Sequence, residues 1–178
     1  MTRKIISAAL LIVAASASQI AAASDGTITF TGNVTAQTCT INGGAAGKNF
    51  SVALPKVSTS SLAAAGATAG RTPFSIALTG CNPVAGTVRT FFEAGPTTDL
   101  TNGRLNLTGS AAGNVQIELL NPDLTQVKAG FADASQNSKP VTLASGAGTL
   151  NYYAQYYAKG ASTAGAANSS VTYTIAYQ

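Results

Sequence analysis

The 178-residue sequence has no histidine, no tryptophan and only two cysteines, and 9% of its residues are charged. Without histidine, the common general base of hydrolytic triads and the usual nitrogen ligand of zinc are absent. Two cysteines exclude a four-thiolate metal site and a disulfide-dense small domain. The charged fraction lies far below the roughly 25% of ordinary soluble domains. Because 46% of the residues are hydrophobic, a charged disordered chain is also excluded, and the length suits one β-rich domain.

The basic residues are scattered rather than clustered. The formal net charge is +4, with Arg3 and Lys4 at the start and the other eight basic residues lying singly from Lys48 to Lys159. A nucleic-acid-binding protein is expected to gather such residues on one face or one element. The sequence therefore predicts no nucleic-acid partner.

Residues 1–23 have the pattern of a secretory signal peptide. Two basic residues precede an apolar run over 5–17, and three alanines end at Ala23. The other interpretation, a transmembrane helix, is disfavoured because the apolar run is short. Cleavage is expected after Ala23, with Ala17 as a second possible position. We therefore expect export, and no membrane insertion of the mature chain.

Export gives the two cysteines a structural meaning. In an oxidising compartment Cys39 and Cys81 are predicted to form a disulfide, the alternative being two buried free thiols. Their spacing excludes a Cys-x-x-Cys redox site. Closing a loop of about forty residues predicts roughly 4 kcal/mol of stabilisation from chain entropy.

Period-two alternation of apolar and polar residues dominates the mature sequence and predicts strands. Turn-forming Asn, Gly and Pro residues separate these segments. The predicted strands are Thr27–Thr31, Pro73–Thr79, Thr87–Glu93, Arg104–Leu107, Asn114–Leu120, Leu150–Tyr157 and Ser170–Gln178. The alanine-rich segment Ser58–Gly70 is predicted to be a loop or a short helix. Many short strands joined by such turns indicate an all-β sandwich or small barrel.

The segment Gly26–Val34 is a regular strand pattern at the start of the mature chain. Ile28, Phe30 and Val34 point to one face, and Gly32 stands in register with them. The pattern fits a first strand of the protein's own sheet. It also fits a strand offered to a neighbouring molecule, and periodicity alone does not name the partner.

The last segment is a second regular pattern. Val171, Tyr173, Ile175 and Tyr177 share one face, and only Gln178 follows. Taken alone, this alternation predicts a buried C-terminal strand.

Motifs along most of the mature sequence resemble those of pilins of the chaperone–usher family, close to the major shaft subunits of type 1 fimbriae. The motifs are Gly26–Val34 with its glycine at position 32, Gln37–Ile41 around the first cysteine, Gly80-Cys81, Ala154–Ala158, Ala164–Asn168, and Tyr173–Gln178 with its penultimate tyrosine. No single motif is diagnostic, but their order and spacing make the resemblance specific. It is weakest over 83–148.

The resemblance implies an incomplete immunoglobulin-like β-sandwich that lacks its last strand. It divides the chain into a signal peptide (1–23), a donor-strand extension (24–36) and a pilin domain (37–178). The donor residues would be Gly26, Ile28, Phe30, Gly32 and Val34. They would fill a groove in a neighbouring copy. The groove edge, which would also contact the chaperone, would be formed by Val171, Tyr173, Ile175 and Tyr177.

The resemblance also implies partners and a location. The partners would be other pilin subunits in a homopolymer, a periplasmic chaperone that fills the groove first, and an outer-membrane usher. The protein would pass through the periplasm to the cell surface and support adhesion as part of a fimbria. No cofactor is implied.

Two other functions stay open as alternatives: a secreted, self-complete β-sandwich that binds a glycan or protein, and a minor fimbrial subunit. An enzyme is not expected, because no pair of acidic residues at short spacing suggests an acid–base dyad. The six acidic residues are Asp25, Glu93, Asp99, Glu118, Asp123 and Asp133.

Overall fold

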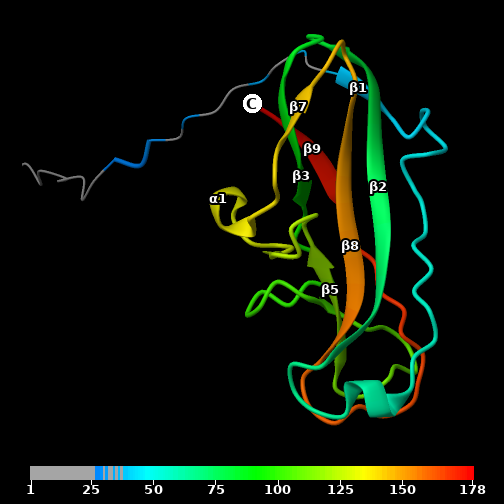
Figure 1. The fold of residues 1–178 in the computed structure, drawn as a ribbon. Helices are drawn as coiled ribbons and strands as arrows, with labels where there is room; N and C mark the ends of the chain where they lie inside the picture. Colours follow the sequence, from blue (N-terminus) through cyan, green and yellow to red (C-terminus); the bar gives the residue numbers. More distant parts are fainter. Residues whose placement is uncertain (1–26, 30, 32–33, 35, 37) are drawn as a thin grey trace, which may run out of the picture. The chain divides into compact units, whose positions relative to one another are not determined.

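The computed structural model of the chain describes residues 27–29, 31, 34, 36 and 38–178 (Figure 1). The chain divides into two units, residues 1–34 and 35–178, and all strands and helices described below belong to the second. The predicted signal peptide and the donor residues Gly26, Phe30 and Gly32 lie outside the described residues. Within the described part, the helices are too short to cross a membrane.

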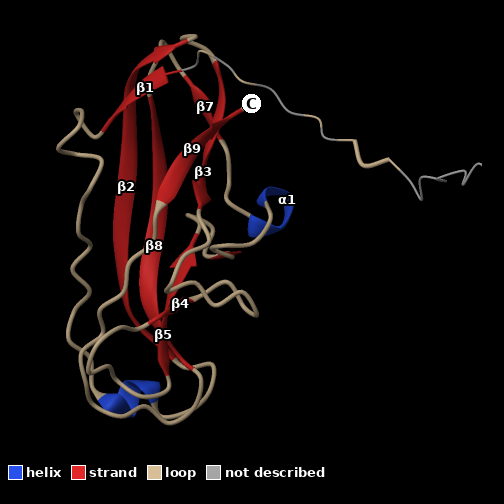
Figure 2. Cartoon of the chain, turned by 180° about the vertical axis from the view of Figure 1, so that it is seen from behind, coloured by secondary structure: helices blue, strands red, loops and turns tan. Residues whose placement is uncertain are grey.

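The larger sheet is built around two long antiparallel strands, β2 and β8. Its order is β1-β2-β8-β5-β4, and β6 pairs with β5. The strands are β1 (Thr38–Ile41), β2 (Thr68–Asn82), β4 (Leu105–Asn106), β5 (Val115–Leu120), β6 (Gln126–Val127) and β8 (Gly148–Ala158). Figures 1 and 2 show β2 and β8 side by side along most of their length.

The smaller sheet has the order β7-β3-β9, with all pairs antiparallel. Its strands are β3 (Gly86–Phe92), β7 (Val141–Leu143) and β9 (Tyr173–Tyr177). Two one-turn helices complete the elements of the described residues: the 3₁₀ helix η1 (Thr59–Leu62) and the α-helix α1 (Asp133–Gln136).

The two sheets enclose one hydrophobic core. Alternate residues of each strand point inward, as strand geometry requires, so that Ile76 of β2 and Val88 of β3 are fully buried. The rings of Phe92 from β3 and Tyr152 from β8 meet edge to face across the core, with centroids 5.3 Å apart. Such an arrangement is favoured for aromatic pairs. The core thus joins both sheets of a sandwich.

The structure confirms all six of the predicted internal and C-terminal strands and changes their bounds. The Pro73–Thr79 strand extends to the whole of β2, while the Arg104–Leu107 strand shortens to β4. The segment Ser58–Gly70 holds η1, but β2 begins within it at Thr68, which the loop prediction missed. Gly70 has a left-handed φ of +69°, and the β2–β8 register shifts between Ala69 and Thr72. Gly70 therefore lies in a β-bulge within β2 and not at the end of a loop.

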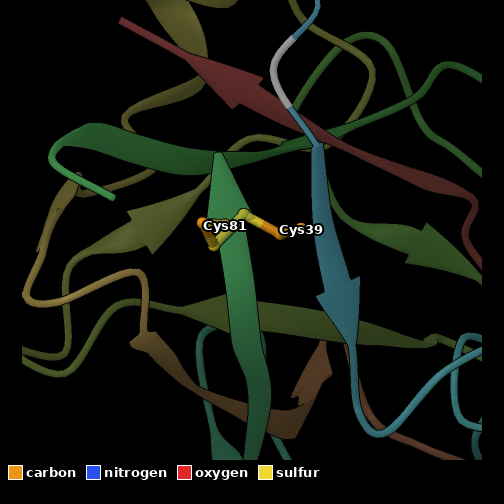
Figure 3. The surroundings of a disulfide bond; sticks show 2 residues. All are labelled: Cys39 and Cys81. Carbon is orange, nitrogen blue, oxygen red and sulfur yellow. A yellow bond between two sulfur atoms is a disulfide. The ribbon is translucent and has the colours of Figure 1, made fainter. Parts of the chain in front are cut away.

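The disulfide between Cys39 and Cys81 is present and joins β1 to β2 (Figure 3). The backbone pairing between these strands is short, because it involves Thr38, Thr40 and Ile41 with a register shift among them. The covalent bond therefore adds to this pairing and to the hydrogen bonds between Asn42 and Ala77 that continue it.

Candidate functional site

Strand β9 lies at an edge of the smaller sheet. In the described part of the chain it pairs with β3 alone. At one end, the N–H of Gln178 donates to the carbonyl of Thr87, and at the other, the N–H of Glu93 donates to the carbonyl of Thr172. Since antiparallel residues alternate between bonded and non-bonded pairs, residues 172, 174, 176 and 178 face β3.

The backbone groups of Tyr173, Ile175 and Tyr177 consequently face the other way, toward the open edge. Each carries one N–H and one C=O group, and no described residue forms a backbone hydrogen bond with them there. A free edge is a template for pairing with another strand, which soluble proteins usually cover or interrupt. Here the edge consists of three regular positions of β9.

An apolar groove of about 1160 Å³ lies at the start of this edge. A groove of this size is far larger than the voids inside packed protein cores, so it has room for a further element against the core. The floor consists of apolar side chains from five strands. They are Phe74, Ile76, Phe92, Leu105, Val115, Ile117, Leu119, Ala154 and Tyr156.

Two segments far apart in the sequence form the walls of the groove. We call residues 48–59 the leading wall and residues 162–173 the trailing wall. The leading wall runs along β2 in Figures 1 and 2, and Val57 lies beside Gly70 of that strand. Its residues 50–57 form no backbone–backbone hydrogen bond with any described residue. Both the leading wall and β9 thus have free backbone groups at the groove.

Sequence reasoning missed the leading wall. Phe50, Val52 and Leu54 alternate as strand residues do, and this signal could have identified the segment. Pro55 and the following serine-rich stretch interrupt the pattern, so it reads as a loop. Val52 and Leu54 are half-buried, whereas Phe50 remains 41% exposed.

The four predicted groove-edge residues occupy two places. Val171 and Tyr173 line the groove, whereas Ile175 and Tyr177 lie further along β9, outside its lining. Ile175 is buried in the core. Burial raises the pKa of Tyr177 and outweighs the opposing hydrogen bond from the backbone of Cys39. Burial also raises the pKa of Tyr173, so both hydroxyls stay protonated at ordinary pH.

The described residues of the predicted donor segment form no strand. Ile28 is 80% exposed and Val34 is 100% exposed, and the first strand of the sandwich begins at Thr38. The predicted strand over Thr27–Thr31 is therefore absent at the four of its positions that are described. The physical reason is that an extended segment gains strand geometry only by pairing, and these residues pair with nothing described.

The site suits an extended apolar segment. Its volume exceeds the roughly 300–1,000 Å³ of pockets for small molecules. A strand added to an open edge binds through main-chain hydrogen bonds, and its alternate side chains enter the space below. The arrangement therefore supports binding of one β-strand.

Comparisons with known proteins agree on one family. The sequence model of the family described as "Type-1 fimbrial protein, A" (FimA) matches residues 54–178. The chain is 52% identical over 169 residues to the major fimbrial subunit SMF-1 of Stenotrophomonas maltophilia (strain K279a), covering 92% of this chain and 98% of that protein. It is 47% identical over 173 residues to the F17 fimbrial protein of Escherichia coli, covering 94% and 95%.

A solved structure shares the fold. A chain from a chaperone–usher pilus studied for rod uncoiling superimposes with a TM-score of 0.61 at 22% identity, covering 87% of this chain and 96% of that one. This likeness confirms the predicted immunoglobulin-like sandwich. Among the described residues, β9 is an edge strand of its smaller sheet.

Proposed function

Because the chain belongs to the type-1 fimbrial protein family and is a structural fimbrial subunit, we propose that it polymerises by donor-strand exchange. Residues 24–36 of one copy fill the groove of the next. The observation that carries the proposal is the open β9 edge beside an apolar groove of about 1160 Å³. Donor-strand complementation between chaperones and pilins is an established example of strand addition to a sheet edge.

The chemistry of the donor segment matches that of the groove. Ile28, Phe30 and Val34 are apolar and alternate, so all three can enter the groove while the backbone pairs with β9. Burying three such side chains is worth about 5–8 kcal/mol before the cost of ordering the segment. Backbone hydrogen bonds to Tyr173, Ile175 and Tyr177 add to this.

The chaperone and the usher are proposed as partners because the open groove must be covered until a donor segment fills it. A groove of this kind exposes apolar surface and an unpaired edge, so a subunit without a donor is prone to aggregate. A periplasmic chaperone would cover the groove until an outer-membrane usher brings in the donor segment of the next subunit. Residues 1–23 would direct export to the periplasm. In this role the protein carries out no catalysis.

Expression with and without a chaperone distinguishes a fimbrial subunit from a self-complete sandwich. We expect the chain expressed alone in the periplasm to yield little soluble monomer, and co-expression with a candidate periplasmic chaperone to yield a one-to-one complex. Size-exclusion chromatography and native mass spectrometry measure both. Adding a peptide of residues 24–36 should displace the chaperone. A stable monomer made without a chaperone would favour the self-complete sandwich instead.

The position of Gly32 gives a test of the donor register. Gly32 shares a face with Ile28, Phe30 and Val34, and a glycine suits a place where two backbones approach closely. Replacing Gly32 with Leu is expected to slow displacement of the chaperone about tenfold, because overpacking costs about 1–3 kcal/mol. The rate is measured by native gel after mixing a peptide of residues 24–36 with the complex.

The matched control for this peptide is Asn33→Leu, which adds the same side chain on the opposite face of the segment. It is expected to exchange at the rate of the unchanged peptide. Equal rates for both substituted peptides would contradict the proposed register.

A further inference from the structure

One hydrogen bond crosses the groove from wall to wall. The hydroxyl of Tyr173, at the end of the trailing wall, donates to the backbone carbonyl of Lys48, at the start of the leading wall, over 2.9 Å. Both residues line the groove, so the bond spans its width. The Lys48 carbonyl belongs to a wall whose neighbouring backbone groups have no described backbone partner.

An aromatic contact lies next to this bond. The ring of Phe50, two residues after Lys48, meets the ring of Tyr173 edge to face with centroids 6.3 Å apart. Phe50 also lies 6.3 Å from Phe74 on the groove floor, which stacks on Tyr152 at 5.5 Å. A row of rings thus continues from the exposed leading wall into the core. These contacts connect the leading wall to both β9 and the floor.

The position of these contacts conflicts with full pairing along β9. The free backbone groups of β9 extend from Tyr173 to Tyr177, while the open part of the groove lies on the other side of Tyr173. A strand that pairs at all of these positions must pass between Tyr173 and the leading wall. The Tyr173 side chain, Phe50 and the Lys48 carbonyl occupy that passage.

We propose that Tyr173, Phe50 and the Lys48 carbonyl form a clasp that closes one end of the empty groove and must open before a strand can pair along β9. The inference rests on the proposed function, since the incoming strand is the donor segment of a second copy. Tyr173 and Phe50 act here as positioning residues. Their mutual contacts belong to the empty groove, so the clasp slows entry of the strand without changing the rate at which a bound strand leaves.

The test separates entry from departure. The full chain, unfolded in denaturant with its disulfide intact, is refolded by dilution and mixed with an excess of a fluorescent peptide of residues 24–36. Fluorescence anisotropy follows uptake, and a chase with unlabelled peptide gives the dissociation rate. Tyr173→Phe keeps the ring and removes the cross-groove bond. It is expected to take up the peptide about three- to tenfold faster, the range expected for loss of one hydrogen bond.

Two further variants complete the design. Phe50→Ala removes the ring contact at a position that is 41% exposed, and it is expected to accelerate uptake as well. Tyr153→Phe is the matched control, because Tyr153 lies on β8 outside the groove lining, and its uptake rate should equal that of the unchanged chain.

The outcomes are distinct. Faster uptake by Tyr173→Phe and Phe50→Ala with unchanged dissociation supports the clasp. Uptake rates equal to the control, or a change confined to dissociation, overturn the clasp and leave strand addition standing. Failure of the unchanged chain to bind the peptide at all overturns the proposed function and the clasp with it.

Discussion

Removing residues 24–35, with the signal peptide kept for export, is expected to abolish fibres while leaving chaperone binding intact. The deletion takes away Ile28, Phe30 and Val34, whose burial is worth about 5–8 kcal/mol. At about 1.4 kcal/mol per tenfold, losing even the lower figure weakens the contact more than a thousandfold. The groove that would receive the chaperone is lined by residues 41 to 173 and is untouched.

Electron microscopy of the cells and unboiled denaturing gels of surface extracts measure this outcome. Chromatography of periplasmic extracts shows whether the chaperone complex persists. The matched control replaces Thr27, Thr29 and Thr31 with Ser, which alters the other face of the same segment and should leave fibres in place. Normal fibres from the deletion would mean that another segment serves as the donor.

Replacing Cys39 and Cys81 together with Ala is expected to lower the free energy of unfolding by about 4 kcal/mol, the chain-entropy value for a loop of this size. Small domains are typically stable by about 5–15 kcal/mol, so the loss is a large fraction of the total. Besides the disulfide, β1 is held by its short pairing with β2, by the hydrogen bonds of Asn42 to the backbone of Ala77, and by the packing of Ile41 against the core. Urea unfolding of the full chain bound to the peptide of residues 24–36, followed by circular dichroism, measures the change.

The unchanged chain reduced with dithiothreitol is the control for this variant. It loses the covalent bond but keeps both sulfur atoms, including that of the buried Cys81. A decrease in the free energy of unfolding that both samples share is due to loss of the cross-link. A further decrease in the Ala variant alone is due to loss of sulfur packing. If neither sample unfolds at a lower urea concentration, the disulfide does not stabilise the domain.

The long strands of the sandwich were predictable, and so was the two-residue β4 within Arg104–Leu107, but the other short elements were not. β2, β8 and β9 contain several alternating apolar residues, enough to reveal a period of two. By contrast, β6 and β7 have two and three residues, and α1 is a single turn, so none of them shows a period. Tertiary contacts form these elements: the buried side-chain amide of Gln136 both accepts from the backbone N–H of Phe92 and donates to its carbonyl.

The candidate site was predictable in part for a similar reason. The shared face of Val171, Tyr173, Ile175 and Tyr177 follows from alternation, but only the folded chain shows that the groove begins at Tyr173 and extends away from Ile175. The opposite wall depends on where the chain runs after the turn that follows β1. Pro55 interrupts the strand pattern of that wall, so the pattern alone does not identify it.

The place of the disulfide bears on how a fibre would carry a mechanical load. If residues 24–34 are held in the next subunit, tension enters this domain through the few residues before Cys39. The bond to Cys81 passes that tension directly into β2, the longest strand, which is paired with β8 along most of its length. The short β1 ladder and the leading wall behind it are thereby relieved of the pull. The groove that holds the preceding donor can keep its shape while the fibre is stretched.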